Sequence, residues 1–135
     1  MKILFTGSRI WTDKKIVKDV LIKLKEKYKD DLCICEGGAK GLDIISKEIA
    51  QSLGIYVFEC DALWDYYSKA AGFLRNQAML SFFIPDIVIG YSKNILESNG
   101  TRDCLNRAIT MGIKTILIND KGEQKLCTER IKYQY

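Results

Sequence analysis

The sequence predicts an α/β protein of the Rossmann-like, doubly wound type, with a mainly parallel five-stranded sheet and helices on both faces. Short apolar runs alternate along the chain with longer segments whose apolar residues recur at helical spacing. Most of the short runs are continuously apolar, which is typical of parallel strands covered on both faces. Because crossovers between parallel strands are right-handed, we expect a strand order of roughly 3-2-1-4-5.

The first half of the chain has the pattern β-α-β-α-β. Helical spacing predicts helices over 16–28 and 42–53. Thr12 or Asp13 is placed to cap the start of the first helix, and Gly54 is placed to end the second. Strands are expected at 3–6, 32–35 and 55–58.

The second half continues the alternation. The segment from Ala70 to Phe83 reads as a helix that ends before Pro85. Residues 103–111 carry apolar side chains on one helical face, and Gly112 closes that helix. The remaining strands are expected at 87–89 and 115–118.

The size and composition indicate one domain. The chain has 135 residues, enough to bury a core without disulfides or metals. Past Asn119 the sequence becomes polar and lysine-rich. We therefore expect a domain over 1–120 and a polar C-terminal tail over 121–135.

The same composition limits the compartment and the chemistry. No apolar run has the length of a membrane span, and Met1-Lys2 leads directly into a strand, so we expect a cytoplasmic protein without membrane contact. The five cysteines lack paired spacings, which favours a reducing compartment. There is no histidine, so we expect no metal site and no cofactor, and any chemistry must use carboxylates, hydroxyls or cysteine.

Glycine-containing turns follow three of the expected strands. Because the carboxyl ends of parallel strands share one edge of a sheet, these turns should lie together near the point where the strand order reverses. A ligand site is therefore expected at this edge. The segments are Gly7-Ser8-Arg9, Gly37-Gly38-Ala39-Lys40-Gly41 and Asn99-Gly100-Thr101.

The turn from Gly37 to Gly41 resembles a phosphate cradle. Glycine lets backbone N–H groups approach an anion closely, and the following helix adds the positive end of its dipole. Gly100-Thr101 before another helix has the same character. Such turns also occur simply to pack a helix against a strand.

Two further groups of residues are candidates for ligand contacts. Arg75 and Asn76 lie inside an expected helix and are either a fork for a phosphate or carboxylate or a surface pair. Trp64 and Trp11 follow strand ends and either stack on a base or cover the edge of the core.

Five motifs follow one another over about residues 1–118. They are Gly7-Ser8-Arg9-x-Trp11-x-Asp13, Gly37-Gly38-Ala39-x-Gly41-x-Asp43, Asp61-x-x-Trp64, Ala71-Gly72-x-x-Arg75-Asn76-x-x-Met79 and Gly100-Thr101-Arg102-Asp103. In this order they resemble the YspA-like branch of the SLOG superfamily.

The resemblance implies a Rossmann-like fold, a site for a nucleotide or nucleotide derivative across the glycine turns, and frequent homodimerisation. The superfamily includes DNA-processing proteins of transformation and the LOG phosphoribohydrolases, which release bases from nucleoside monophosphates. LOG enzymes carry a glutamate three positions after the threonine of their second glycine motif, and here that position holds Cys104. Asp103 is one residue earlier, about 100° away around a helix. Glu36, Asp43, Asp61 and Asp103 remain available as acids or bases, and Asp43 and Asp103 are the candidates for a catalytic role. Asp43 is equally placed as a helix cap or an acceptor for a ribose hydroxyl.

Three functions remain open. The first is binding of a nucleotide-type small molecule for sensing or sequestration. The second is hydrolysis of an N-glycosidic bond in a nucleotide. The third is binding of single-stranded nucleic acid through the basic residues of the tail, Lys121, Lys125, Arg130 and Lys132.

Overall fold

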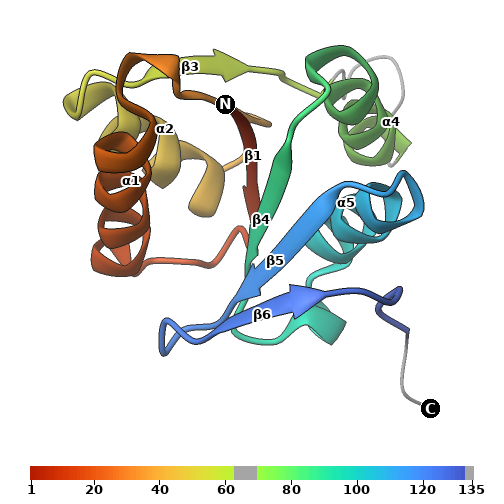
Figure 1. Ribbon diagram of the computed structural model, residues 1–135. Helices are drawn as coiled ribbons and strands as arrows, with labels where there is room; N and C mark the ends of the chain where they lie inside the picture. Colours follow the sequence, from red (N-terminus) through yellow and green to blue (C-terminus); the bar gives the residue numbers. More distant parts are fainter. Residues whose placement is uncertain (63–69, 133–135) are drawn as a thin grey trace.

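The computed structural model describes residues 1–62 and 70–132, and these form a six-stranded sheet with helices on both faces (Figure 1). The sheet order is β3-β2-β1-β4-β5-β6. The first five strands are parallel, and β6 is antiparallel to β5. The strands are β1 (Lys2–Gly7), β2 (Cys33–Glu36), β3 (Tyr56–Glu59), β4 (Ile87–Tyr91), β5 (Lys114–Ile118) and β6 (Gln124–Cys127). The α/β class and the 3-2-1-4-5 order of the parallel strands are confirmed.

The sixth strand corrects the expected count of five. Residues 124–127 belong to the segment expected to be a polar tail, and they pair with β5 in register. A tight turn precedes them, with Gly122 at φ +79° and the Asn119 side chain accepting from the amides of Lys121 and Glu123. Leu126 is 56% exposed, so this edge strand is held mainly by backbone hydrogen bonds. Because the strand buries few side chains, its sequence contains no apolar run that would predict it.

Among the described residues, α-helices cover both faces of the sheet (Figure 1). The capping side chain of Asp13 accepts a hydrogen bond from the Ile16 amide, as expected of an N-cap. Gly54 and Gly112 end their helices in the left-handed conformation, where glycine is favoured. The helices are α1 (Lys14–Tyr28) and α2 (Leu42–Ser52) on one face, and α4 (Ala71–Ala78) and α5 (Asn99–Thr110) on the other. Single turns of 3-10 helix occur at η1 (Lys29–Asp31) and η4 (Ile95–Glu97).

The core has two layers because β1 is buried on both sides. Ile3 and Phe5 point into the layer beneath α1 and α2, and Leu4 between them points into the layer beneath α4 and α5. All three are fully buried. The central position of β1 therefore fixes the turn that follows it between the two helical layers.

The expected helix over 70–83 is not uniform. After α4 the chain forms a π-helical turn, η3 (Met79–Phe83), and then Ile84 adopts a left-handed conformation at φ +53° before Pro85. Over the described parts of the chain, none of the helices combines the length and the apolar character that crossing a membrane requires.

Candidate functional site

A cleft of about 900 Å³ lies at the carboxyl ends of β1 and β4, where the strand order reverses. Ligand pockets usually have volumes of about 300–1,000 Å³, and in open parallel sheets they lie at this position. The cleft is lined by residues from four places: the end of β1, the start of α2, helix α4, and the segment from the end of β4 into α5.

Most of the site residues expected from the sequence line this cleft. They are Gly7, Ser8, Arg9, Ala39, Asp43, Arg75, Asn76, Gly100 and Thr101. Gly37, Gly38 and Gly41 are near it but are not among its lining residues. Asp103 lines a second cleft, and Trp64 lies outside the described residues.

The turn from Gly37 to Gly41 is filled by protein groups. A side chain at Gly37 would meet the Arg75 guanidinium, and one at Gly38 would meet the Asp61 carboxylate. At Gly41, with φ +83°, a Cβ would lie 2.5 Å from the backbone oxygens of Ser8 and Arg9. These glycines therefore allow close packing of neighbouring segments, which is the structural role that such turns have without a ligand.

Gly100 differs because its surroundings are open. A Cβ placed there would have no heavy atom within 4 Å, and the residue lines the cleft in the first turn of α5. The N-cap residue, Ser98, makes no side-chain capping bond, and its hydroxyl lies 2.7 Å from that of Ser92. The positive end of the α5 dipole is therefore presented to the cleft.

Asp43 places a buried carboxyl group at the cleft. The residue is 5% exposed, and its Oδ2 accepts a hydrogen bond from the Ala39 amide at 3.2 Å. Its buried Oδ1 has no hydrogen-bond partner among the residues that the structure describes. Burial raises the pKa of this carboxyl to about 6, although the nearby Arg75 guanidinium and backbone amides act in the opposite direction. Near neutral pH, Asp43 can therefore exchange a proton or accept a hydrogen bond from a ligand hydroxyl.

Glu36 is a second buried acid behind the glycine turn. It is fully buried at the end of β2, and its Oε2 accepts a hydrogen bond from the Gly38 amide. Burial, together with the neighbouring Glu59 carboxyl, raises the pKa of Glu36 to about 9. Glu59, its partner in the β2–β3 register, also forms a 3.0 Å ion pair with Lys47. The carboxyl group of Glu36 is therefore protonated at pH 7, and it holds the turn from Gly37 to Gly41 through its hydrogen bond with the Gly38 amide.

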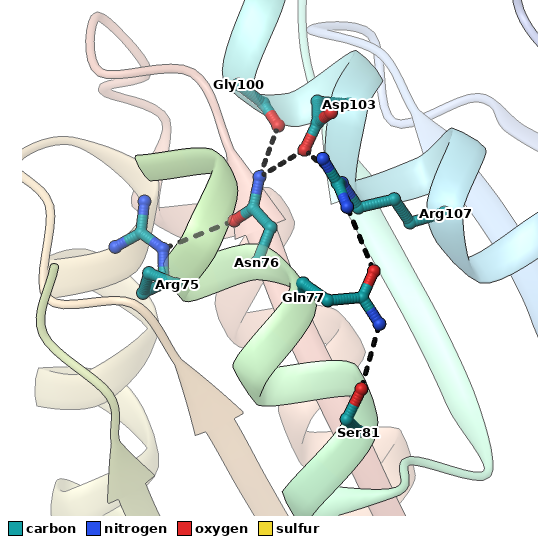
Figure 2. Close-up of polar contacts among 7 residues, drawn as sticks. All are labelled: Arg75, Asn76, Gln77, Ser81, Gly100, Asp103 and Arg107. Carbon is teal, nitrogen blue, oxygen red and sulfur yellow. Dashed lines mark hydrogen bonds and ion pairs between the residues drawn. The ribbon is translucent and has the colours of Figure 1, made fainter. Parts of the chain in front are cut away.

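Asn76 is the centre of a polar network between α4 and α5 (Figure 2). It is 2% exposed, and its Nδ2 donates to the Gly100 carbonyl and to Asp103 Oδ2, each at 3.1 Å. Its Oδ1 accepts from Arg75 Nε at 3.2 Å, and Arg75 also donates to the Gly37 carbonyl. The arginine and asparagine are therefore not a solvated surface pair, because they join the β2 turn to the start of α5.

The same network uses the carboxylate of Asp103. Its Oδ2 accepts from both Asn76 and Arg107, the latter at 2.9 Å. Asp103 does not line the 900 Å³ cleft. Of the four carboxylates considered as acids or bases, Asp43 is the one among the lining residues of that cleft.

The segment after β4 adds lining residues that the sequence analysis missed. Ser92, Lys93 and Asn94 follow directly on Tyr91, the last residue of the strand. A hydroxyl, an ammonium and an amide at the end of a parallel strand are the same signal that identified Gly7 to Arg9. Ser92, Lys93 and Asn94 include no glycine, which is the feature that marks the other strand-end turns in the sequence.

Trp11 covers the core and does not face the ligand cleft. It is 5% exposed, and its ring packs edge-on against Tyr91 with centroids 5.5 Å apart. Its indole Nε1 donates to the Asp13 carbonyl at 2.8 Å. Of the two roles considered for this tryptophan, the structural one is observed.

Comparisons with known proteins agree with this architecture. The family model described as the YspA, cpYpsA-related SLOG family matches residues 1–67. The gene 61 protein of Mycobacterium phage D29 is 32% identical over 125 residues, covering 89% of this chain and 98% of the phage protein. The chain belongs to the SLOG superfamily.

The fold of this SLOG protein is also found in a solved structure. The DNA processing protein A of Streptococcus pneumoniae superimposes with a TM-score of 0.70 at 21% identity. The match covers 87% of this chain and 50% of the streptococcal chain, so the present protein spans about half the length of the DNA processing protein A. At this identity the likeness supports the Rossmann-like fold.

One departure from the LOG branch of the superfamily has a clear structural setting. Cys104, which stands where LOG enzymes carry glutamate, is fully buried. Burial raises the pKa of its thiol to about 12. This position therefore supplies neither an acid nor a base near neutral pH.

Proposed function

We propose that this SLOG protein binds a nucleotide-derived small molecule through its phosphate in the 900 Å³ cleft. The observation that carries the proposal is the start of α5, where Gly100 leaves open space beside an uncapped helix N-terminus that lines the cleft. The phosphate site is thus assigned to Gly100 and Thr101 and not to the filled turn at Gly37.

The other walls suit the remaining parts of a nucleotide. Lys93, Arg9 and Arg75 add positive charge around the cleft, which favours an anionic ligand. Asp43 lines the cleft, and its carboxylate is the acceptor that we assign to a sugar hydroxyl. The cleft thus offers a positive wall for the phosphate and an acceptor for the sugar.

The test is a titration of the purified protein with nucleoside monophosphates of the four common bases, followed by calorimetry. Gly100→Val should weaken binding at least about tenfold, because the added side chain occupies the space assigned to the phosphate. Thr110→Val, at the other end of α5 and outside this cleft, is the matched control. The nucleosides without phosphate should bind weakly to the unmodified protein.

Two results would contradict the proposal. One is wild-type affinity in a folded Gly100→Val protein. The other is binding of single-stranded oligonucleotides, but of no mononucleotide, with an affinity that falls steeply with salt. The second result would favour the nucleic-acid function instead.

Asp43 supports a second candidate, hydrolysis of the N-glycosidic bond of the bound nucleotide. A carboxyl with a pKa of about 6 is suited to general acid–base catalysis at neutral pH. Ionised Asp43 would take a proton from water as the water oxygen attacks the sugar C1′. The C1′–N bond would break with its electron pair going to the base, which takes up a proton from solvent, and Asp43 would then release its proton to solvent. The products would be free base and the sugar phosphate.

Asp43→Asn separates the two candidates. It should stop release of free base, measured by chromatography after incubation with nucleoside monophosphates, while phosphate binding persists. In the active protein the rate should rise as pH increases through about 6, because the ionised form is the base. Intact nucleotides across the whole panel would leave binding as the function.

A further inference from the structure

A second cleft, of about 590 Å³, adjoins the first one across the start of α5. Phe73 and Asn99 line both clefts. The network in Figure 2 lies between them, with Asn76 lining the first cleft and Asp103 and Arg107 lining the second. The two clefts are therefore neighbours that meet at Phe73 and Asn99.

The second cleft is basic, and its arginines are held in place. Arg102, Arg107 and Arg130 line it together with one acidic residue, Asp103. Arg107 donates to Asp103 Oδ2 and to Gln77 Oε1, both at 2.9 Å. Arg102, 5% exposed, donates to the Leu96 carbonyl at 2.8 Å. Guanidinium groups fixed in this way lose little freedom when they bind an anion.

Arg130 reaches the cleft because the chain beside it is anchored. The Asn106 side chain donates to the Ile131 carbonyl at 2.9 Å and accepts from the Ile131 amide at 2.7 Å. Ile131 also packs against the core layer beneath α5. These two hydrogen bonds resemble those between neighbouring strands, with the Asn106 amide in place of a second backbone segment. They hold the chain next to Arg130, whose side chain is exposed, beside α5.

We infer that the second cleft takes a second phosphate of the ligand bound in the first cleft. The ligand class is then a nucleotide with two phosphates separated by a nucleoside, as in a nucleoside 3′,5′-bisphosphate or a dinucleotide. Phe73, 41% exposed and shared by both clefts, places an aromatic side chain beside the nucleoside that joins the two phosphates, where its ring can pack against the base. This inference rests on the proposed nucleotide binding and specifies its ligand.

The experiment compares AMP, adenosine 3′,5′-bisphosphate and the 5′-phosphorylated dinucleotide pApA, with the guanosine, cytidine and uridine counterparts. At least one two-phosphate ligand should bind about tenfold more tightly than its monophosphate, since a second phosphate gains charge-assisted hydrogen bonds. Comparing the bisphosphate with the dinucleotide shows whether the second phosphate is a terminal group or the phosphodiester that joins two nucleosides.

Arg130→Gln should remove this gain and leave AMP affinity unchanged. Lys125→Gln, which removes the same charge from exposed β6 outside both clefts, is the matched control and should keep the gain. Asn106→Ala frees the segment that holds Arg130 and should reduce the gain in a folded protein.

The failures are distinguishable. Monophosphate binding with no gain from a second phosphate, or an equal loss for all ligands in Arg130→Gln, would overturn the inference alone. Absence of binding by every mononucleotide and two-phosphate ligand would overturn the proposed function. An affinity that keeps rising from dinucleotides to decanucleotides would replace the small-molecule ligand with a nucleic-acid strand.

Discussion

At the residue scale, Glu36 shows how an acidic side chain can serve as a neutral structural group. Its carboxyl is fully buried between the Gly38 amide and Glu59. In the unfolded chain it would ionise near its ordinary pKa of 4.5, whereas the folded pKa is about 9. Between these values the folded protein holds a proton that the unfolded chain has lost, so this group makes stability fall as pH rises.

Glu36→Gln tests this assignment. Between about pH 6.5 and pH 8.5 the free energy of unfolding of the natural sequence should decrease, by up to about 1.4 kcal/mol per pH unit. Glutamine keeps an acceptor for Gly38 and a donor for Glu59 but does not titrate, so the variant should show a flatter profile. The measurement is denaturant unfolding across that range, and parallel profiles for the two proteins would contradict the assignment.

The sequence indicated where Asp43 and Glu36 stand along the chain but not what each does. Asp43 is expected to be a cap, a ribose acceptor or a base, and its position in the lining of the cleft keeps the last two roles open. The glycines from 37 to 41 were expected to cradle phosphate. Their space is taken by Arg75, Asp61 and the backbone at Arg9, which are distant in sequence and whose approach no local pattern reveals.

At the scale of elements, the buried polar contact between α4 and α5 is centred on one amide. Asn76 joins the Gly100 carbonyl, Asp103 and Arg75, and no solvent is available to replace these bonds at a residue 2% exposed. Losing a buried hydrogen-bonding partner costs about 1–3 kcal/mol. The position of the α5 N-terminus, and with it the proposed phosphate site, thus rests on Asn76.

Asn76→Ala should lower the free energy of unfolding by about 2 kcal/mol and increase amide hydrogen exchange in the first turn of α5. The matched control is Gln77→Ala, which removes the outer bonds to Arg107 and Ser81 from a more exposed residue and should cost less than about 1 kcal/mol. Equal destabilisation by the two variants would show that Asn76 has no special role.

Helix and strand positions followed from periodicity, whereas local irregularities did not. The π turn at Met79–Phe83 keeps apolar residues on the covered face, so its sequence looks like a continuation of α4. Strand β6 has few apolar residues because an edge strand needs only backbone pairing on one side. Both features depend on neighbours in the fold, beyond the reach of a local pattern.

At the scale of the whole molecule, the predicted fold and the position of the cleft were correct because they follow from chain topology. Right-handed crossovers and continuous apolar strands determine the order of the parallel strands, and that order determines where their ends open. The second cleft escaped the sequence analysis because Arg130 reaches α5 only through the bonds between Asn106 and Ile131. The expected homodimer remains a prediction, which the molar mass in solution can test.

The central place of β1 also has a consequence for the order in which the protein assembles. One edge of β1 pairs with β2, which is made soon afterwards, but the other edge pairs with β4, whose residues start at Ile87. While the chain grows from the ribosome, that buried edge has no partner until most of the domain has been synthesised. We therefore expect the β1-β2-β3 half to form first, with an unpaired central edge prone to aggregation. Both clefts would then be completed late, since their walls need α5 and, for the second cleft, Arg130.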